Sequence, residues 1–132
     1  MTPLKIVLGS NIRQTILIFQ EAAQVVPFEV IAEQTFEDFL LTIQERAYHA
    51  VAFDFRIRSD IDPIKTIRLI RQMRPRVPLL VIADTVDKKT GSQIMNEGVL
   101  HILSTPLTKE NVKDALIAVF NIIKLKAERG VP

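Results

Sequence analysis

Four short segments of the sequence carry polar residues where an α/β protein could place chemistry. Each follows a short apolar run, and they are residues 9–11, 54–58, 83–85 and 104–106. The first reads Gly9-Ser10-Asn11, which could cradle a phosphate, line a metal site or form only a turn. Asp54 supplies a carboxylate, the group that both a hard metal ion and phosphoryl transfer to an acid need. These segments define the candidate site.

Five apolar runs alternate with segments of helical periodicity along the chain. The runs predict β-strands at residues 5–8, 29–32, 50–53, 79–82 and 100–103. All but one consist almost wholly of apolar residues, as parallel strands do when helices cover both faces of a sheet. Five βα units predict an α/β fold with a single doubly wound five-stranded parallel sheet. The carboxyl ends of its strands, and with them the four polar segments, should share one edge.

Helices are predicted between and after these strands. The first should bury a stripe made of Ile12, Ile16, Phe19 and Ala23, and the second one made of Phe36, Phe39, Leu40, Ile43 and Ala47. Three N-caps are expected at Thr35, Asp62 and Thr108. The fourth helix, within residues 86–97, has few apolar positions and is interrupted by Gly91, and we expect Asp84 to cap its start.

Length and composition exclude several classes of protein. A length of 132 residues predicts one domain over residues 1–132. The sequence has no cysteine, no secretory signal and no apolar run of membrane-span length. We therefore expect a cytoplasmic protein that does not contact membranes. No hydrolase elbow, Walker loop or dinucleotide glycine pattern occurs, and His49 and His101 are expected at the opposite edge from the candidate site. We therefore expect that this protein is not an enzyme.

Positive charge is concentrated in one segment. The net charge is only +2, but residues 56–76 hold seven basic and two acidic residues. A solvated helix face explains this pattern, and a docking face for an acidic partner is the alternative. Aromatic residues that could stack on bases do not interleave with the charges, so we expect no nucleic acid as a partner.

The polar segments resemble those of the receiver domain of bacterial two-component response regulators, over nearly the whole chain. The segment "AYHAVAFDFRI" is similar to the third strand of that family and puts Asp54 at the phosphoacceptor position. In "VPLLVIADT", Ala83 stands where the family has a Thr or Ser, and in "EGVLHILSTPL", Thr105 stands where it has a lysine, directly before Pro106. The resemblance implies the flavodoxin-like strand order 2-1-3-4-5 and a cis peptide at Thr105-Pro106.

Most of the residues that catalyse phosphorylation in that family are replaced in this sequence. The acidic pair that holds Mg²⁺ is replaced by Gly9-Ser10, followed by Asn11, so Asp54 is the one catalytic residue that remains. A single carboxylate is a poor ligand set for Mg²⁺, and we expect no metal and no other cofactor. The aromatic residue of the family's switch is replaced by Ile102, so the signal readout should have changed as well.

Asp54 also has structural interpretations, which the sequence leaves open. A strand-end aspartate can accept backbone N–H groups from a neighbouring loop, or it can be an inherited acceptor that is inactive. Arg56 or Arg58 could pair with Asp54 and act as a fixed cation, although arginines in loops normally point to solvent.

The last predicted helix offers a contact surface. Its buried stripe should consist of Val112, Leu116, Val119 and Ile123. Ile117 and Leu125 fall well off that stripe and Phe120 lies at its edge, as expected for a face that contacts another protein or a second copy of the chain. The leading hypothesis is an atypical receiver domain that serves bacterial signal transduction as a phosphorylation-independent protein-interaction module. The alternatives are a receiver still phosphorylated at Asp54 and a small flavin- or nucleotide-binding protein that uses Gly9-Ser10-Asn11.

Overall fold

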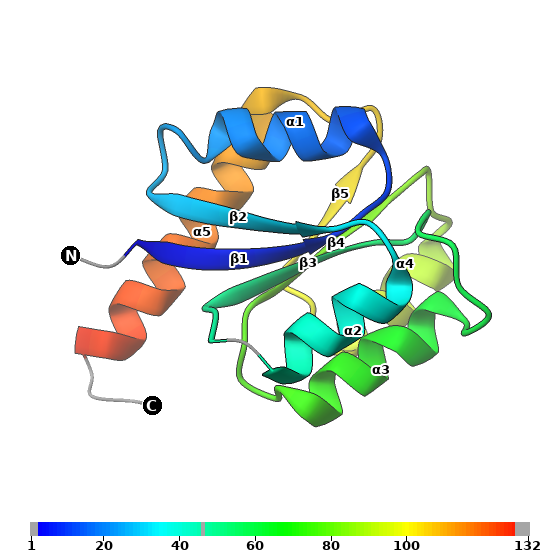
Figure 1. The fold of residues 1–132 in the computed structure, drawn as a ribbon. Helices are drawn as coiled ribbons and strands as arrows, with labels where there is room; N and C mark the ends of the chain where they lie inside the picture. The colour runs from blue at the N-terminus through cyan, green and yellow to red at the C-terminus, as the bar shows by residue number, and fades with distance from the viewer. Residues whose placement is uncertain (1–2, 46, 129–132) are drawn as a thin grey trace.

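Strands and helices alternate throughout the computed structural model, which describes residues 3–45 and 47–128. The strands are β1 (Leu4–Gly9), β2 (Phe28–Glu33), β3 (Ala50–Asp54), β4 (Leu79–Ala83) and β5 (His101–Ser104). The helices are α1 (Arg13–Ala22), α2 (Phe36–Glu45), α3 (Pro63–Met73), α4 (Lys88–Asn96) and α5 (Lys109–Glu128). All strands are parallel and lie in the order β2-β1-β3-β4-β5, which confirms the predicted flavodoxin-like sheet (Figure 1).

Helices cover both faces of the sheet. Figure 1 shows α1 and α5 on one face and α2, α3 and α4 on the other. Alternate residues of the central strands belong to two separate cores: Leu8 and Leu80 pack with α1 and α5, whereas Val7 and Val81 pack on the other side. Burial on both faces explains why the strands read as nearly unbroken apolar runs.

Helix starts follow the predicted capping residues with one exception. The side chains of Thr35, Asp62 and Thr108 each accept a backbone N–H from the first turn that follows. The cap predicted at Asp84 is wrong: α4 begins later, and Asp87 caps it by accepting the N–H of Thr90 at 2.7 Å. Asp84 is therefore left in the loop after β4, beside the candidate site.

The predicted helix stripes need two corrections. In α1 the buried residues are Thr15, Ile18, Phe19 and Ala22, so Phe19 is the one member of the predicted stripe that is fully covered. The second helix ends at Glu45, which leaves Ala47 outside it and exposed. The predicted domain covers residues 1–132, of which residues 1–2, 46 and 129–132 lie outside the described residues. Among the described residues, none of the helices combines the length and apolar character that crossing a membrane requires.

Candidate functional site

The carboxylate of Asp54 lies fully buried at the carboxyl end of β3. The neighbouring strand β1 ends at Gly9, and the next residue, Ser10, is also fully buried. The hydroxyl of Ser10 donates to Oδ2 of Asp54 at 2.7 Å and accepts the N–H of Ile12 at 3.2 Å. The backbone N–H of Ser10 donates to the carbonyl of Glu33 at 3.1 Å, which fixes the turn in place. Gly9-Ser10-Asn11 is thus a turn that holds a hydroxyl against Asp54, with Asn11 exposed to solvent.

Arg56 supplies a cation to the same carboxylate. Its Nε donates to Oδ1 of Asp54 at 2.9 Å and its Nη2 to Oδ2 at 2.8 Å, the two-pronged geometry in which a guanidinium binds a carboxylate most strongly. The backbone N–H of Arg56 adds a further bond to Oδ1 at 2.9 Å. Hydrogen bonding to Asp54 raises the pKa of Arg56 above its ordinary value. Of the two arginines that the sequence left open, Arg56 makes the pair with Asp54, whereas Arg58 is exposed.

The Arg56 side chain also reaches α1. Its Nη2 donates to Oγ1 of Thr15 at 2.8 Å, which satisfies a hydroxyl that is almost completely buried. This contact explains why Thr15 turns inward in place of the predicted Ile16. Arg56 therefore joins the loop after β3 to the first helix, with Asp54 as its counter-ion.

The carboxyl ends of β4 and β5 form the other half of the site. Ala83 is buried, and its carbonyl accepts the backbone N–H of Thr105 at 3.0 Å. The hydroxyl of Thr105 donates to Oδ1 of Asp84, and the peptide between Thr105 and Pro106 is cis, as the resemblance implied. Ile102 is half-buried and packs against the core beneath α2, α3 and α4. A hollow of about 470 Å³ opens between α1 and the loops after β3 and β5, with Arg56 and Thr105 in its wall.

Carboxylates are sparse around Asp54. Within residues 3–45 and 47–128, no three or more His, Asp or Glu side chains lie together in a way that could hold a metal ion. Asp84 lies in the loop after β4, and its carboxylate accepts the hydroxyl of Thr105. His49 lies before β3, at the opposite edge, where its Nδ1 accepts the N–H of Lys5 at 2.9 Å.

Two arginines of the basic segment are structural clamps, which the sequence analysis missed. Arg71 donates to the carbonyls of Val77, Glu97 and Gly98, and Arg74 donates to two carbonyls and to the hydroxyl of Tyr48. The solvated-face interpretation is therefore wrong for Arg71 and Arg74. Arg74 follows the last residue of α3, and no pattern of residue types in the sequence marks a side chain that donates to backbone carbonyls.

The predicted contact face on α5 is partly exposed. Ile117 keeps 40% of its surface exposed and Leu125 keeps 46%. Phe120 is half-buried and packs against the core shared by α1 and α5. The two exposed residues are separated by about 80° around the helix, so they flank its outer side.

Comparisons with known proteins agree with this fold. No protein-family model matches the sequence, and the search of curated proteins found no match. A receiver domain protein from Methanospirillum hungatei JF-1 superposes with a TM-score of 0.80 at 12% identity, covering 97% of this chain and 99% of that chain. The BeF3-activated DrrB receiver domain gives 0.78 at 20% identity, covering 91% and 99%. A structure described as an adenylate cyclase from Rhodopirellula baltica gives 0.81 at 19% identity, covering 98% and 96%.

The chain therefore has the CheY-like fold of response-regulator receiver domains. The hydrogen-bonded side chains of Ser10, Asp54 and Arg56 lie where the resemblance places the phosphoacceptor.

Proposed function

We propose that this chain is a receiver-fold signalling module that works through protein contacts and does not depend on phosphoryl transfer to Asp54. The observation that carries the proposal is the bidentate pairing of Asp54 with Arg56. A carboxylate must present an unencumbered oxygen to phosphorus before it can act as a nucleophile. Here Oδ1 accepts two N–H groups of Arg56, and Oδ2 accepts one from Arg56 and the hydroxyl of Ser10.

The ligand set at Asp54 does not suit Mg²⁺. This ion prefers an octahedron of oxygen ligands and relies on charged carboxylates to offset the loss of its water. At the end of β1 the chain offers a glycine and the Ser10 hydroxyl, and the guanidinium of Arg56 already neutralises Asp54. A divalent cation would have to displace or approach that guanidinium, which like-charge repulsion opposes. We propose that Mg²⁺ has no role here.

A phosphorylation switch depends on a difference between the contacts of the unmodified and the phosphorylated site, and a fixed cation at Asp54 removes this difference. Arg56 links Asp54 to Thr15 of α1, and Thr105 links to Asp84 across the ends of β4 and β5. Both contacts are internal to the chain, so they need no added group to form. A ligand can shift the equilibrium between two conformations only by binding one of them more tightly than the other. The contacts of Arg56 and Thr105 already favour one conformation of the site. We propose that the module presents a constant surface.

The last helix is the contact surface that the proposal favours. Ile117 and Leu125 are large apolar side chains with about half of their surface in solvent, as in a protein-binding patch. The basic third helix is a weaker candidate, because Arg68 pairs with Glu97 at 2.7 Å and Arg71 donates to backbone carbonyls. We propose a protein partner in a cytoplasmic bacterial signalling pathway, with a second copy of this chain as one form that partner can take.

A direct assay of phosphoryl transfer tests this proposal. The protein is incubated with Mg²⁺ and acetyl phosphate, and its intact mass is followed by mass spectrometry beside a phosphoaccepting receiver domain as positive control. We expect the mass of this chain to stay unchanged while the control gains a phosphoryl group. A phosphorylated species that disappears in the Asp54→Asn variant would overturn the proposal.

A further inference from the structure

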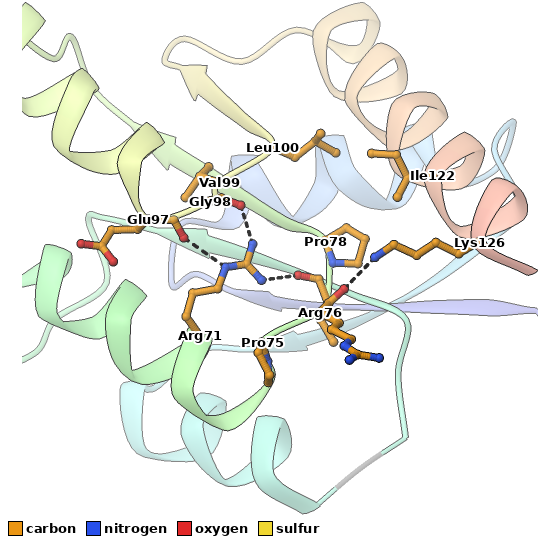
Figure 2. Close-up of a pocket in the computed structure, with 11 residues that line it drawn as sticks. Arg71, Pro75, Arg76, Pro78, Glu97, Gly98, Val99, Leu100, Ile122 and Lys126 are labelled. Atoms are coloured by element: carbon orange, nitrogen blue, oxygen red, sulfur yellow. Dashed lines mark hydrogen bonds between the residues drawn. The ribbon is translucent and has the colours of Figure 1, made fainter. Parts of the chain in front are cut away.

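A second hollow opens at the amino ends of β4 and β5, at the edge of the sheet opposite Asp54. Its volume is about 570 Å³, within the range of small-molecule binding pockets. The apolar part of its wall combines residues from three parts of the chain, namely Val77, Pro78, Val99, Leu100 and Ile122. Figure 2 shows Leu100 and Ile122 facing each other across one side of this space. The hollow is therefore distinct from the site around Asp54.

The polar part of the wall carries positive charge. Arg71 donates from Nη1 to the carbonyl of Val77 at 2.5 Å, from Nη2 to that of Gly98 at 2.6 Å and from Nε to that of Glu97 at 3.2 Å (Figure 2). These three partners are neutral carbonyls, so they satisfy its donors without offsetting its charge. Burial lowers the pKa of Arg71 below its ordinary value, as expected for a cation held away from water.

Two further cations lie at the rim. Lys126 of α5 donates from Nζ to the backbone carbonyl of Arg76 at 3.0 Å, and the side chain of Arg76 is exposed. Glu97 is the acidic residue in the wall, and its carboxylate pairs with Arg68 at 2.7 Å. In Figure 2 that carboxylate points away from the hollow. Three cations thus line one side of an apolar space, and the acidic residue in its wall is already paired.

We propose that this hollow binds a small organic anion with an apolar body. The carboxylate or phosphate of such a ligand would lie among Arg71, Arg76 and Lys126, and its apolar part would cover Leu100 and Ile122. Arg71 uses three of its five N–H groups on carbonyls and Lys126 uses one of three, so both retain donors for an anion. A partly desolvated cation beside an apolar surface binds an anion more strongly than an exposed cation does. This inference goes beyond the proposed function and does not rest on it.

A matched pair of probes separates charge from apolar contact. The full chain is titrated with naphthylacetate, a carboxylate on an aromatic body, and with its uncharged amide, while backbone amide NMR shifts are followed. We expect saturable shifts at Val77, Gly98, Val99 and Leu100 with the carboxylate, and at least tenfold weaker binding of the amide. Equal affinity for both probes, or shifts confined to other parts of the chain, would overturn the proposal. Saturable binding of inorganic phosphate with the same affinity would also overturn it, because the apolar wall would then contribute nothing.

Two variants assign the binding to the rim cations. The double variant Arg76→Gln with Lys126→Gln should weaken naphthylacetate binding at least tenfold, and Ile122→Trp should abolish it by filling the hollow without adding charge. Lys124→Gln removes one charge from an exposed position on the same helix and serves as the matched control, with unchanged affinity expected. Arg71 is left intact because its carbonyl contacts support the fold. A double variant that binds as tightly as the control would contradict the assignment.

Discussion

The guanidinium of Arg56 closes on the carboxylate of Asp54 through two parallel side-chain hydrogen bonds, 2.9 Å from Nε to Oδ1 and 2.8 Å from Nη2 to Oδ2. Asp54 is fully buried, and Arg56 keeps a quarter of its side chain in solvent. The pair neutralises a charge that would otherwise be costly at the end of a central strand. Stability and the proposed loss of phosphorylation therefore depend on the same contact.

Replacing Arg56 should destabilise the fold. In Arg56→Gln, Asp54 stays buried without its counter-ion. We expect the free energy of unfolding to fall by about 2–4 kcal/mol. This loss is smaller than that for breaking a fully buried ion pair, because Arg56 is partly solvated. Urea denaturation measures this loss. Arg58→Gln removes an exposed arginine from the same loop and should change the free energy by less than about 0.5 kcal/mol.

A double variant separates the charge effect from lost packing. Adding Asp54→Asn to Arg56→Gln removes the buried charge that the single variant leaves unpaired, so part of the lost stability should return. If Arg56→Gln proves as stable as Arg58→Gln, the ion pair between Arg56 and Asp54 does not stabilise the fold.

Gly9 should not tolerate a side chain. A Cβ at this position would lie 2.6 Å from Cδ1 of Phe39, a fully buried ring that stacks on Phe53 with 5.7 Å between centroids. We expect Gly9→Ala to lower the free energy of unfolding by about 1–3 kcal/mol through overpacking. Gly91→Ala is the matched control, because a Cβ there meets nothing closer than 3.9 Å and alanine favours the helix by about 0.5–1 kcal/mol. Equal effects of the two changes, measured by thermal unfolding, would remove this explanation of the glycine.

Tyr48 offers a titration that no other residue obscures, because the chain has one tyrosine and no tryptophan. Burial raises the pKa of Tyr48 above 10.0, while the hydrogen bond and charge of Arg74 act in the opposite direction. Since folding raises this pKa, the phenol's contribution to stability is complete below pH 10.0 and is lost as the pH rises through the folded value. Absorbance of tyrosinate should therefore show a midpoint above 10.0 in the folded protein.

Arg74→Gln should move that midpoint higher still, because it removes the groups that lower the pKa. Arg76→Gln changes an exposed neighbour and should leave the midpoint in place. A midpoint that does not move in Arg74→Gln would contradict the 3.1 Å contact between Arg74 Nε and the Tyr48 hydroxyl.

Leu125 tests the proposed contact face. If this face joins two copies of the chain, the average mass in sedimentation should rise with concentration, and Leu125→Glu should keep the protein monomeric by burying an unpaired charge at the contact. Leu41→Glu makes the same change on α2, on the other face of the sheet, and should leave the mass unaffected. A monomer at every concentration would remove the dimer as a form of the partner.

The positions of the strands were predictable from burial on both faces of the sheet, whereas their order followed from the resemblance to receiver domains. Parallel central strands read as apolar runs, so the runs at residues 50–53 and 79–82 appear in the structure with one more residue each at the carboxyl end. The α1 stripe was shifted because Thr15, a polar residue, is buried by a hydrogen bond from Arg56. A contact across 41 residues of sequence leaves no periodic pattern.

The candidate site was predictable in position and only partly in its contacts. Spacing placed Ser10, Asp54, Ala83 and Thr105 on one edge, where the structure has them. The choice between Arg56 and Arg58, and the bond from Thr105 to Asp84, depended on loop conformation, which residue types alone do not set. The clamps made by Arg71 and Arg74 were missed because their acceptors are backbone carbonyls, which every residue carries.

We propose that Arg56 takes the place of the cations that phosphoryl transfer to Asp54 would require. Beryllium fluoride with Mg²⁺ imitates a bound phosphoryl group, so the most direct measurement is a titration of the chain with both, followed by backbone amide NMR. We predict no saturable shifts at residues 54–58, 83–85 and 104–106. Saturable shifts centred on Asp54 and Thr105, lost in the Asp54→Asn variant, would contradict the account.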